Sequence, residues 1–533
     1  MTDNLLKDKK EEIYENFETD DNKEEELKKK KAKSKLAKPL IIVIAFLLIF
    51  AGFIYFKYFH RSSNSLSLTL LEKYNELGKK DENLRLFVLT ELFLDKRKLK
   101  YTNAEIILHF NKDDIDLNRL LRAIKIMVEN QAVFQSIFYQ KDGQYHIKFD
   151  KNLYPEIIQK TIKESEYNNC LDEIEKSIHF NLNELMYKIY IIQTEKSLYL
   201  MIFKQHCITD KMTSNAFFNT LNKAYLMNDT TTPFKSGDLY YASLYDYNLK
   251  LKDKKFVNYV KNYFSKNYDL GRTFKGYRID KDIQYPLQDI VIGFGDISSK
   301  SLRDKIYSIF GGKVSKISMF NIICHLYTLY LYNNMEDHIP EIVYLRHGRN
   351  LKYYQDTMGC LLQNSFINYD ILKNTIKKNG KNYLNVQKFY ENVKKQFDEQ
   401  KSIAGYVKAI ENYDYINSLD NLAYCQMYQV HEIDEKTIST KFWPRYIFGK
   451  EVLEKTKASI IFNGDQSETH FIRLIFENVY SPSGIINHFG ANADSYSIET
   501  LQKISKLFFK VADTLSDGFL AEDKLIEIKM LDY

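Results

Sequence analysis

The chain has 533 residues, of which 44% are hydrophobic and 14% aromatic, enough to build a large core or two packed lobes. Its seven prolines and 19 glycines are too few for a disordered or low-complexity protein. The 76 basic and 70 acidic residues leave a net charge of +6, a balance that argues against a nucleic-acid binder. The five cysteines are scattered without zinc-ligand spacing, so we predict neither a metal site nor a disulfide framework.

The N-terminal segment differs in composition from the rest of the chain. Residues 1–38 are almost entirely charged or polar and end in a lysine cluster, which predicts disorder. Residues 39–59 are nearly all apolar and long enough to cross a hydrocarbon core of about 30 Å. A cleaved signal peptide fits poorly because the polar region before it is too long, and the uniform apolarity argues against a core helix. We therefore predict one transmembrane helix at 39–59.

The lysine distribution predicts how this helix is oriented. Lysine is dense before the span and sparser after it, so the positive-inside rule favours a cytoplasmic N-terminus. Lys57 and Arg61 lie on the far side and oppose this orientation. The sequence thus predicts a single-pass membrane protein whose large domain lies outside the cytoplasm.

From about residue 66 onward, strand and helix patterns alternate, which predicts a mixed α/β (α+β) fold. The first half contains a predicted strand at 101–110, a helix that begins after Asp114 or Asp116, a hairpin at 137–149, strands at 188–194 and 197–203, and a helix at 213–226. The second half contains predicted strands at 288–294 and 341–346, and helices near 299–309, 316–333, 386–400 and 498–517. Two α/β lobes of similar size would leave a cleft between them, where substrate sites commonly form.

The turn between the strand at 197–203 and the helix at 213–226 carries the best candidate for chemistry. His206 leaves an apolar strand there, and Asp210 follows four residues later. A histidine held in a turn has the near-neutral pKa and fixed position that a general base requires. Alone, the pair is more typical of a hydrogen-bonded core histidine than of a catalytic base. We assign no role to His325. For His347, which is close to Arg349 in the sequence, we favour a plain packing role over the alternative that it lines the cleft.

Several short motifs follow one another along the chain in an order that can be compared with known families. They are Phe180-Asn181-Leu182, the run Gln205-His206-Cys207-Ile208-Thr209-Asp210-Lys211 with Thr213 after it, Gly348-Arg349, and Met358-Gly359-Cys360-Leu361-Leu362-Gln363. Over roughly residues 66–530 the chain resembles the condensation domains of nonribosomal peptide synthetases, within the chloramphenicol acetyltransferase-like superfamily. The run at 205–211 resembles that family's His-His-x-x-x-Asp-Gly signature. The resemblance implies two chloramphenicol acetyltransferase-like lobes in a V-shaped pseudo-dimer, at 66–265 and 266–533.

The resemblance also implies roles for individual residues. His206 would be the catalytic base, and Asp210 would hold the turn by pairing with Arg349 from the second lobe. A guanidinium can satisfy both oxygens of a buried carboxylate. Gln205 replaces the first His of the signature, Lys211 replaces its Gly, and Gln363 with Asn364 replaces an Asn. Residues that would line the tunnel are Gln205, Lys211, Thr213, Gln363 and Asn364.

Three functions remain open at this stage. The first is an acyltransferase that forms an amide or ester by attack of an amine or hydroxyl on an activated acyl group, with no metal or bound cofactor. Its donor would be acyl carrier phosphopantetheine, a CoA thioester, or a lipid- or glycan-borne acyl group, with a carrier protein as partner if the domain is cytoplasmic. The second is a catalytically degenerate domain that serves as a binding or docking module. The third is a membrane-anchored structural protein.

Overall fold

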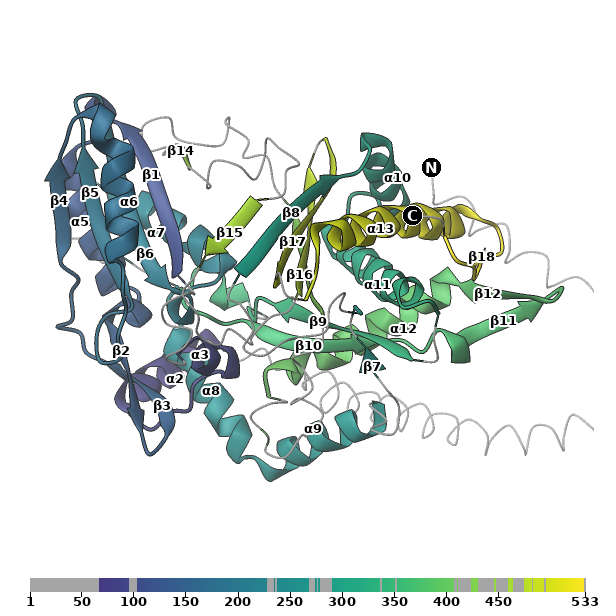
Figure 1. Ribbon diagram of the computed structural model, residues 1–533. Coiled ribbons are helices and arrows are strands. Elements are labelled where there is room, and N and C mark those ends of the chain that lie inside the picture. Colours follow the sequence, from purple (N-terminus) through teal and green to yellow (C-terminus); the bar gives the residue numbers. More distant parts are fainter. Residues whose placement is uncertain are drawn as a thin grey trace, which may run out of the picture. The chain divides into compact units, whose positions relative to one another are not determined.

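The first lobe is built on a sheet whose central strand, β6 (Ser197–Gln205), is buried at all nine positions. A strand buried along its whole length must be covered on both faces, which explains its continuous apolar run. β6 pairs antiparallel with β1 (Asn103–Asn111) and β5 (Tyr187–Gln193). The strands of this sheet lie in the order β14 (Arg445–Tyr446), β1, β6, β5 and β4 (Ile157–Thr161) (Figure 1).

Helices and one hairpin complete the first lobe. Helix α5 begins after Asp116, whose side chain accepts a hydrogen bond from the Arg119 amide, so Asp116 rather than Asp114 is the cap. Helix α5 packs beside α7, and α2 packs beside α8. The elements of this part are α2 (Leu68–Lys80), α3 (Val88–Leu94), α5 (Leu117–Glu129), β2 (Ser136–Lys141), β3 (Gln144–Phe149), α6 (Tyr167–Ser177), α7 (Lys211–Leu226), α8 (Tyr240–Lys252) and α9 (Lys254–Asn267).

The second lobe is built on an eight-stranded sheet (Figure 1). Its strands lie in the order β10 (Gln363–Asn368), β9 (Ile339–Arg346), β13 (Ala423–Gln429), β16 (Leu474–Ser481), β17 (Gly484–Asn492), β8 (Ile290–Ile297) and β15 (Ser459–Asn463), with β7 (Phe274–Lys275) beside β9. Its helices are α10 (Lys300–Phe310), α11 (Val314–Tyr332), α12 (Val386–Glu399) and α13 (Ile498–Leu520). A small sheet joins β11 (Thr375–Lys378), β12 (Lys381–Asn385) and β18 (Leu525–Glu527). The predicted mixed α/β class is confirmed.

This architecture comes from a computed structural model of the whole chain. It describes residues 67–94, 103–227, 234, 237–267, 274–275, 277–278, 290–335, 338–349, 352–406, 410, 423–429, 445–446, 459–463, 474–481, 483–492 and 495–531. The predicted disordered segment at 1–38 and the predicted span at 39–59 lie outside these residues. Leu68–Tyr533 forms one compact unit.

The predicted membrane location is overturned by the described part of the chain, in which no helix is long and apolar enough to cross a bilayer. Helix α11 has 19 residues and is strongly apolar, but it is buried among the strands and helices of the second lobe. A helix that is apolar all round is a core helix when protein encloses it. The expectation of a cytoplasmic N-terminus with the large domain outside falls with this correction.

A chain of side-chain hydrogen bonds crosses the core of the second lobe. Asn478 Oδ1 on β16 accepts from His325 Nε2 at 2.5 Å and from Asn321 Nδ2 at 2.8 Å, both on α11. Asn478 donates to Asn487 Oδ1 on β17 at 2.6 Å, and Asn487 donates to Ser505 Oγ on α13 at 2.9 Å. These five residues form what we call the amide cluster, and none is more than 1% exposed. His325 is therefore a core residue.

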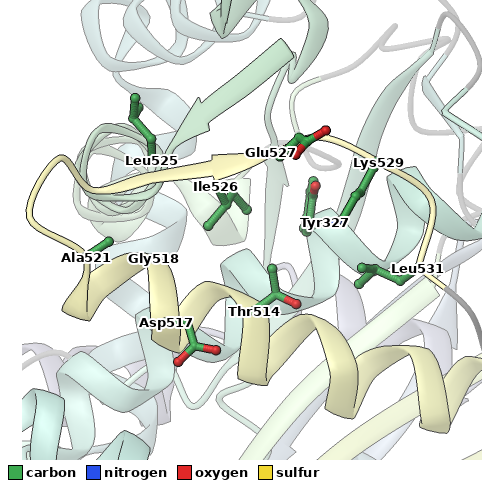
Figure 2. A pocket seen from close by; sticks show the side chains of 10 residues that line it. All are labelled: Tyr327, Thr514, Asp517, Gly518, Ala521, Leu525, Ile526, Glu527, Lys529 and Leu531. Atoms are coloured by element: carbon green, nitrogen blue, oxygen red, sulfur yellow. The ribbon is translucent and has the colours of Figure 1, made fainter. Parts of the chain in front are cut away.

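A cavity of about 360 Å³ lies where the C-terminal segment with β18 passes over α13 (Figure 2). Tyr327, Asp517, Glu527 and Lys529 supply polar groups to its lining, with apolar side chains such as Ile526 between them. None of the residues predicted for the functional site lines this cavity. It is therefore separate from the site described next.

Candidate active site

The turn after β6 is held by its own side chains. Gln205, the last residue of β6, is fully buried, and its Oε1 accepts a hydrogen bond from the Cys207 amide at 2.6 Å. The Thr209 amide donates to the His206 carbonyl at 3.2 Å. Gln205 thus lies inside the protein and fixes the backbone on either side of His206.

His206 is half-buried at the start of this turn. Burial lowers the pKa of its imidazole below the usual 6.5, and the positive charge of the buried Lys204 lowers it further. The negative charge of Asp210 opposes both effects. The result is an imidazole that is mostly neutral at pH 7, which is the protonation state of a general base.

Asp210 uses both of its carboxylate oxygens to fix the turn. Its Oδ1 accepts from the Thr213 amide at 2.8 Å and from Thr213 Oγ1 at 3.0 Å, so Asp210 caps the N-terminus of α7. Its Oδ2 accepts from Arg349 Nη1 at 2.7 Å and from the Leu361 amide at 3.1 Å. Both oxygens are therefore occupied, and only 3% of the residue is exposed, so Asp210 ties the turn to α7 and to the segment after β9.

Arg349 links the two lobes through the same carboxylate. Nη1 also donates to the His347 carbonyl at 3.1 Å, while Nη2 donates to Thr213 Oγ1 at 3.3 Å and to the Thr357 carbonyl at 3.0 Å. The predicted ion pair is present, but the guanidinium contacts one oxygen of Asp210 and not both, because Thr213 takes the other. We call Asp210, Thr213 and Arg349 the interlobe cluster; each is at most 3% exposed.

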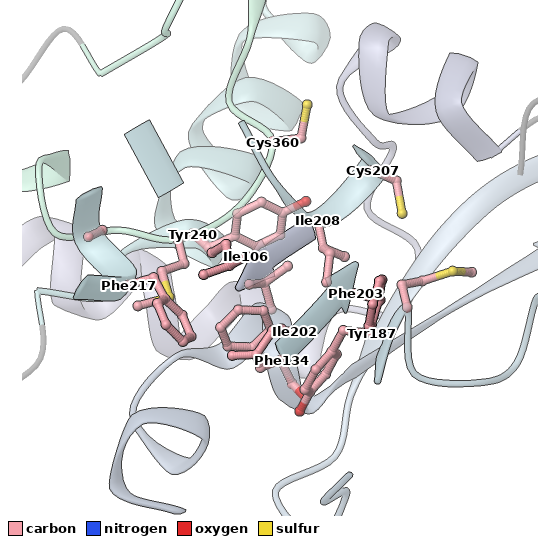
Figure 3. Close-up of a cluster of buried hydrophobic side chains, with 14 of the residues drawn as sticks. Ile106, Phe134, Tyr187, Ile202, Phe203, Cys207, Ile208, Phe217, Tyr240 and Cys360 are labelled. Atoms are coloured by element: carbon pink, nitrogen blue, oxygen red, sulfur yellow. The ribbon is translucent and has the colours of Figure 1, made fainter. Parts of the chain in front are cut away.

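The segment from Gly348 to Leu361 carries second-lobe residues into the first-lobe core. Gly348 has φ +66°, and a Cβ there would lie 1.8 Å from the Leu361 carbonyl oxygen, so only glycine fits. The Gly359 amide donates to Thr213 Oγ1 at 3.1 Å. Cys360 packs in the same apolar cluster as Cys207 and Tyr240 (Figure 3). This packing holds Arg349 against the turn of His206.

Two residues in this junction were not predicted from the sequence. Gln131, after α5, is fully buried; its Oε1 accepts from the Met358 amide at 3.0 Å. Thr357 Oγ1 donates to the Gly237 carbonyl at 2.9 Å. Neither residue has a sequence signal, because each bonds backbone that is more than a hundred positions away.

The remaining predicted residues lie at the edges of the site. Lys211 begins α7, and its side chain is outside the described part of the structure. Gln363 and Asn364 are the first two residues of β10, opposite Arg346 and Leu345 on β9, and both are half-buried. Among the described residues, no group of three or more His, Cys, Asp or Glu side chains could hold a metal ion.

Comparisons with known proteins identify the fold. No family model and no curated protein matches the sequence. The epimerization domain from the third module of tyrocidine synthetase B matches with a TM-score of 0.58 and 11% identity, over 79% of this chain and 94% of that one. The starter condensation domain of rhizomide synthetase, a mutant solved in complex with C8-CoA, matches with a TM-score of 0.58 and 9% identity, over 81% and 95%.

A third match is the X-domain from teicoplanin biosynthesis, solved in complex with OxyB. Its TM-score is 0.58 and its identity 11%, over 82% of this chain and 94% of that one. The chain therefore has the fold of nonribosomal peptide synthetase condensation and epimerization domains and of related chloramphenicol acetyltransferase-like proteins.

Proposed function

We propose that this protein is an acyltransferase in which His206 is the general base. The acceptor is an amine or a hydroxyl, the donor is an activated acyl group, and the products are an amide or an ester. We assign the lobes to residues 66–265 and 266–533, with the reaction at their junction.

One observation carries this proposal: a half-buried imidazole with a lowered pKa lies in a turn that is fixed on both sides. Gln205 Oε1 bonds the Cys207 amide on one side at 2.6 Å, and Asp210 caps α7 on the other. Arg349 holds Asp210 from the second lobe at 2.7 Å. A base held in one position avoids the entropic cost of finding the reacting geometry.

The reaction balances with this single base. His206 takes the proton of the acceptor while the acceptor nitrogen or oxygen attacks the acyl carbonyl carbon. When the bond from that carbon to the leaving group breaks, the leaving group departs with the proton that His206 took. The enzyme ends in its starting state.

A thioester is the donor class that the comparisons favour. The starter condensation domain of rhizomide synthetase, which shares this fold, was solved with C8-CoA. A CoA thioester is therefore the first donor to test, ahead of lipid- or glycan-borne acyl groups. A carrier protein that bears the acyl group on phosphopantetheine remains a candidate partner.

The test uses the purified full chain with octanoyl-CoA as the donor and mixtures of free amino acids and primary alcohols as acceptors. Release of the CoA thiol and the mass of the acylated product are the readouts. His206→Ala should lower the rate about 10²-fold or more, with the melting temperature little changed. His179→Ala is the matched control, because His179 is exposed in the loop after α6.

The pH profile adds an independent readout. Because burial lowers the pKa of His206, kcat/KM should stay high down to pH 6.5 and fall only below it, as the imidazole becomes protonated. Wild-type protein that releases no CoA thiol above the buffer blank would overturn the proposal. So would a His206→Ala variant with wild-type turnover.

A binding or docking module is the second candidate. It is favoured by the X-domain, which has this fold and was solved in complex with OxyB. The replacement of the first signature His by Gln205 and of its Gly by Lys211 is in keeping with such a role. A docking module would bind its partner equally well with and without His206, and it would not turn over octanoyl-CoA.

A further inference from the structure

His347 occupies a position that the proposed reaction has not used. It follows β9 and is exposed, whereas its neighbours Arg346, Gly348 and Arg349 are buried. From the sequence we favoured a plain packing role for this histidine, with cleft lining as the alternative; because it is exposed, it is not a core residue. Its ring reaches the surface directly beside the interlobe cluster.

The hydrogen bonds of His347 define where its proton is. The Arg349 backbone amide donates to His347 Nδ1 at 3.0 Å. A backbone amide can only donate, so Nδ1 carries no proton and the neutral ring carries it on Nε2. Neighbouring protein atoms that displace water lower the pKa of His347 below the usual 6.5, and the charge of Arg349 lowers it further. At pH 7 the ring is therefore a neutral Nε2–H donor.

The same contacts connect His347 to the turn of His206. Arg349 Nη1 donates both to the His347 carbonyl at 3.1 Å and to Asp210 Oδ2 at 2.7 Å. The His347 backbone is thus two hydrogen bonds from the carboxylate that holds the His206 turn. The negative charge of Asp210 raises the pKa of both imidazoles, so both lie within the electrostatic reach of this one buried carboxylate.

We propose that His347 is a second catalytic residue, whose Nε2–H donates a hydrogen bond to the acyl carbonyl oxygen as His206 activates the acceptor. This inference rests on the proposed acyl transfer. As the acceptor attacks, an electron pair moves from the carbonyl bond onto oxygen, and Nε2–H stabilises that negative charge. His347 keeps its proton throughout, and the leaving thiol receives the proton held by His206. Such donors act mainly on the transition state.

Two substitutions separate this role from a structural one. In His347→Asn, the side-chain carbonyl can take the place of Nδ1 and accept from the Arg349 amide, but no donor reaches the position of Nε2. In His347→Gln, the amide nitrogen can reach the position of Nε2, but the acceptor at Nδ1 is lost. The two variants thus each keep one of the two nitrogen functions.

The experiment measures octanoyl-CoA turnover by the full chain for both variants, together with their melting temperatures. Loss of the donor in His347→Asn should lower kcat and kcat/KM equally, by about 10²-fold, with little change in melting temperature. His347→Gln should retain activity within about tenfold of wild type. Full activity in His347→Asn, or low activity in His347→Gln alone, overturns the inference and leaves a structural role.

The outcomes also separate this inference from the proposed function. If wild-type protein does not transfer the acyl group, both fail together. If His206→Ala is inactive while His347→Asn is fully active, only the role of His347 fails. If His206→Ala and His347→Asn are inactive at an unchanged melting temperature while His347→Gln is active, the proposed function and the role of His347 are both supported.

Discussion

The interlobe cluster and the amide cluster are both buried, but they are built from different chemistry. The interlobe cluster pairs the Asp210 carboxylate with the Arg349 guanidinium at 2.7 Å. The amide cluster has no formal charge: burial lowers the pKa of His325 to about 3, so its ring is neutral and donates to Asn478. The first joins two lobes, and the second joins α11 to two strands and α13 within one lobe.

This difference in charge predicts how much stability the protein loses when one partner of each cluster is removed. A neutral side chain left unpaired in a core costs about 1–3 kcal/mol, whereas a charge left unpaired costs more. A charged pair is therefore sensitive to any separation of its partners. This suits the interlobe cluster, where Arg349 must stay against the turn that carries His206.

The largest effect is expected from Asp210→Ala. It leaves the buried Arg349 guanidinium without its carboxylate and removes the cap of α7, so the free energy of unfolding should fall by about 3–5 kcal/mol. Urea denaturation of wild type and variant measures this loss. A loss below about 1 kcal/mol would contradict the view that the pair joins the lobes.

Gly348→Ala should be the next most damaging change. A Cβ at this left-handed position meets the Leu361 carbonyl oxygen at 1.8 Å, so strain and overpacking together should cost about 2–4 kcal/mol. Gly380→Ala is the matched control, because Gly380 has φ +73° and a Cβ added to it would have no neighbour within 4 Å. Equal melting temperatures for the two variants would show that the segment after β9 is not closely packed.

The amide cluster should respond to pH through His325. Its pKa is about 3 in the folded chain and near 6.5 when unfolded, so the unfolded state binds more protons between these values and stability falls as pH falls. From pH 6.5 to 5.0 this group should cost about 2 kcal/mol. His325→Gln should remove this part of the pH dependence of the free energy of unfolding, measured by urea denaturation at the two pH values. An unchanged pH dependence would rule out His325 as its source.

The smallest effect is expected from an ion pair on the surface. Lys394 and Asp398 lie one turn apart on α12 at 2.5 Å, with side chains 52% and 54% exposed. Asp398→Ala should change the free energy of unfolding by less than about 1 kcal/mol, since water already solvates both charges. The contrast with Asp210→Ala, measured in the same urea series, isolates the contribution of burial.

The sequence predicted the elements with strong periodicity and missed those without it. The helix predicted near 386–400 is α12 (Val386–Glu399), and the strand predicted at 341–346 is the end of β9. Strands β16 and β17 were not predicted. Each is an interior strand with another strand on either side, and each carries a buried Asn, so polar and apolar residues do not alternate regularly along it.

By itself the sequence determined the local frame of the site: the apolar run of β6, the turn that follows it, and Asp210 at the start of α7. The resemblance to condensation domains also implied Arg349 as the partner of Asp210. Only the tertiary structure decided that Arg349 reaches a single oxygen, that Gln205 is buried, and that His347 is exposed. Those features depend on contacts between segments far apart in sequence, and local periodicity carries no information about them.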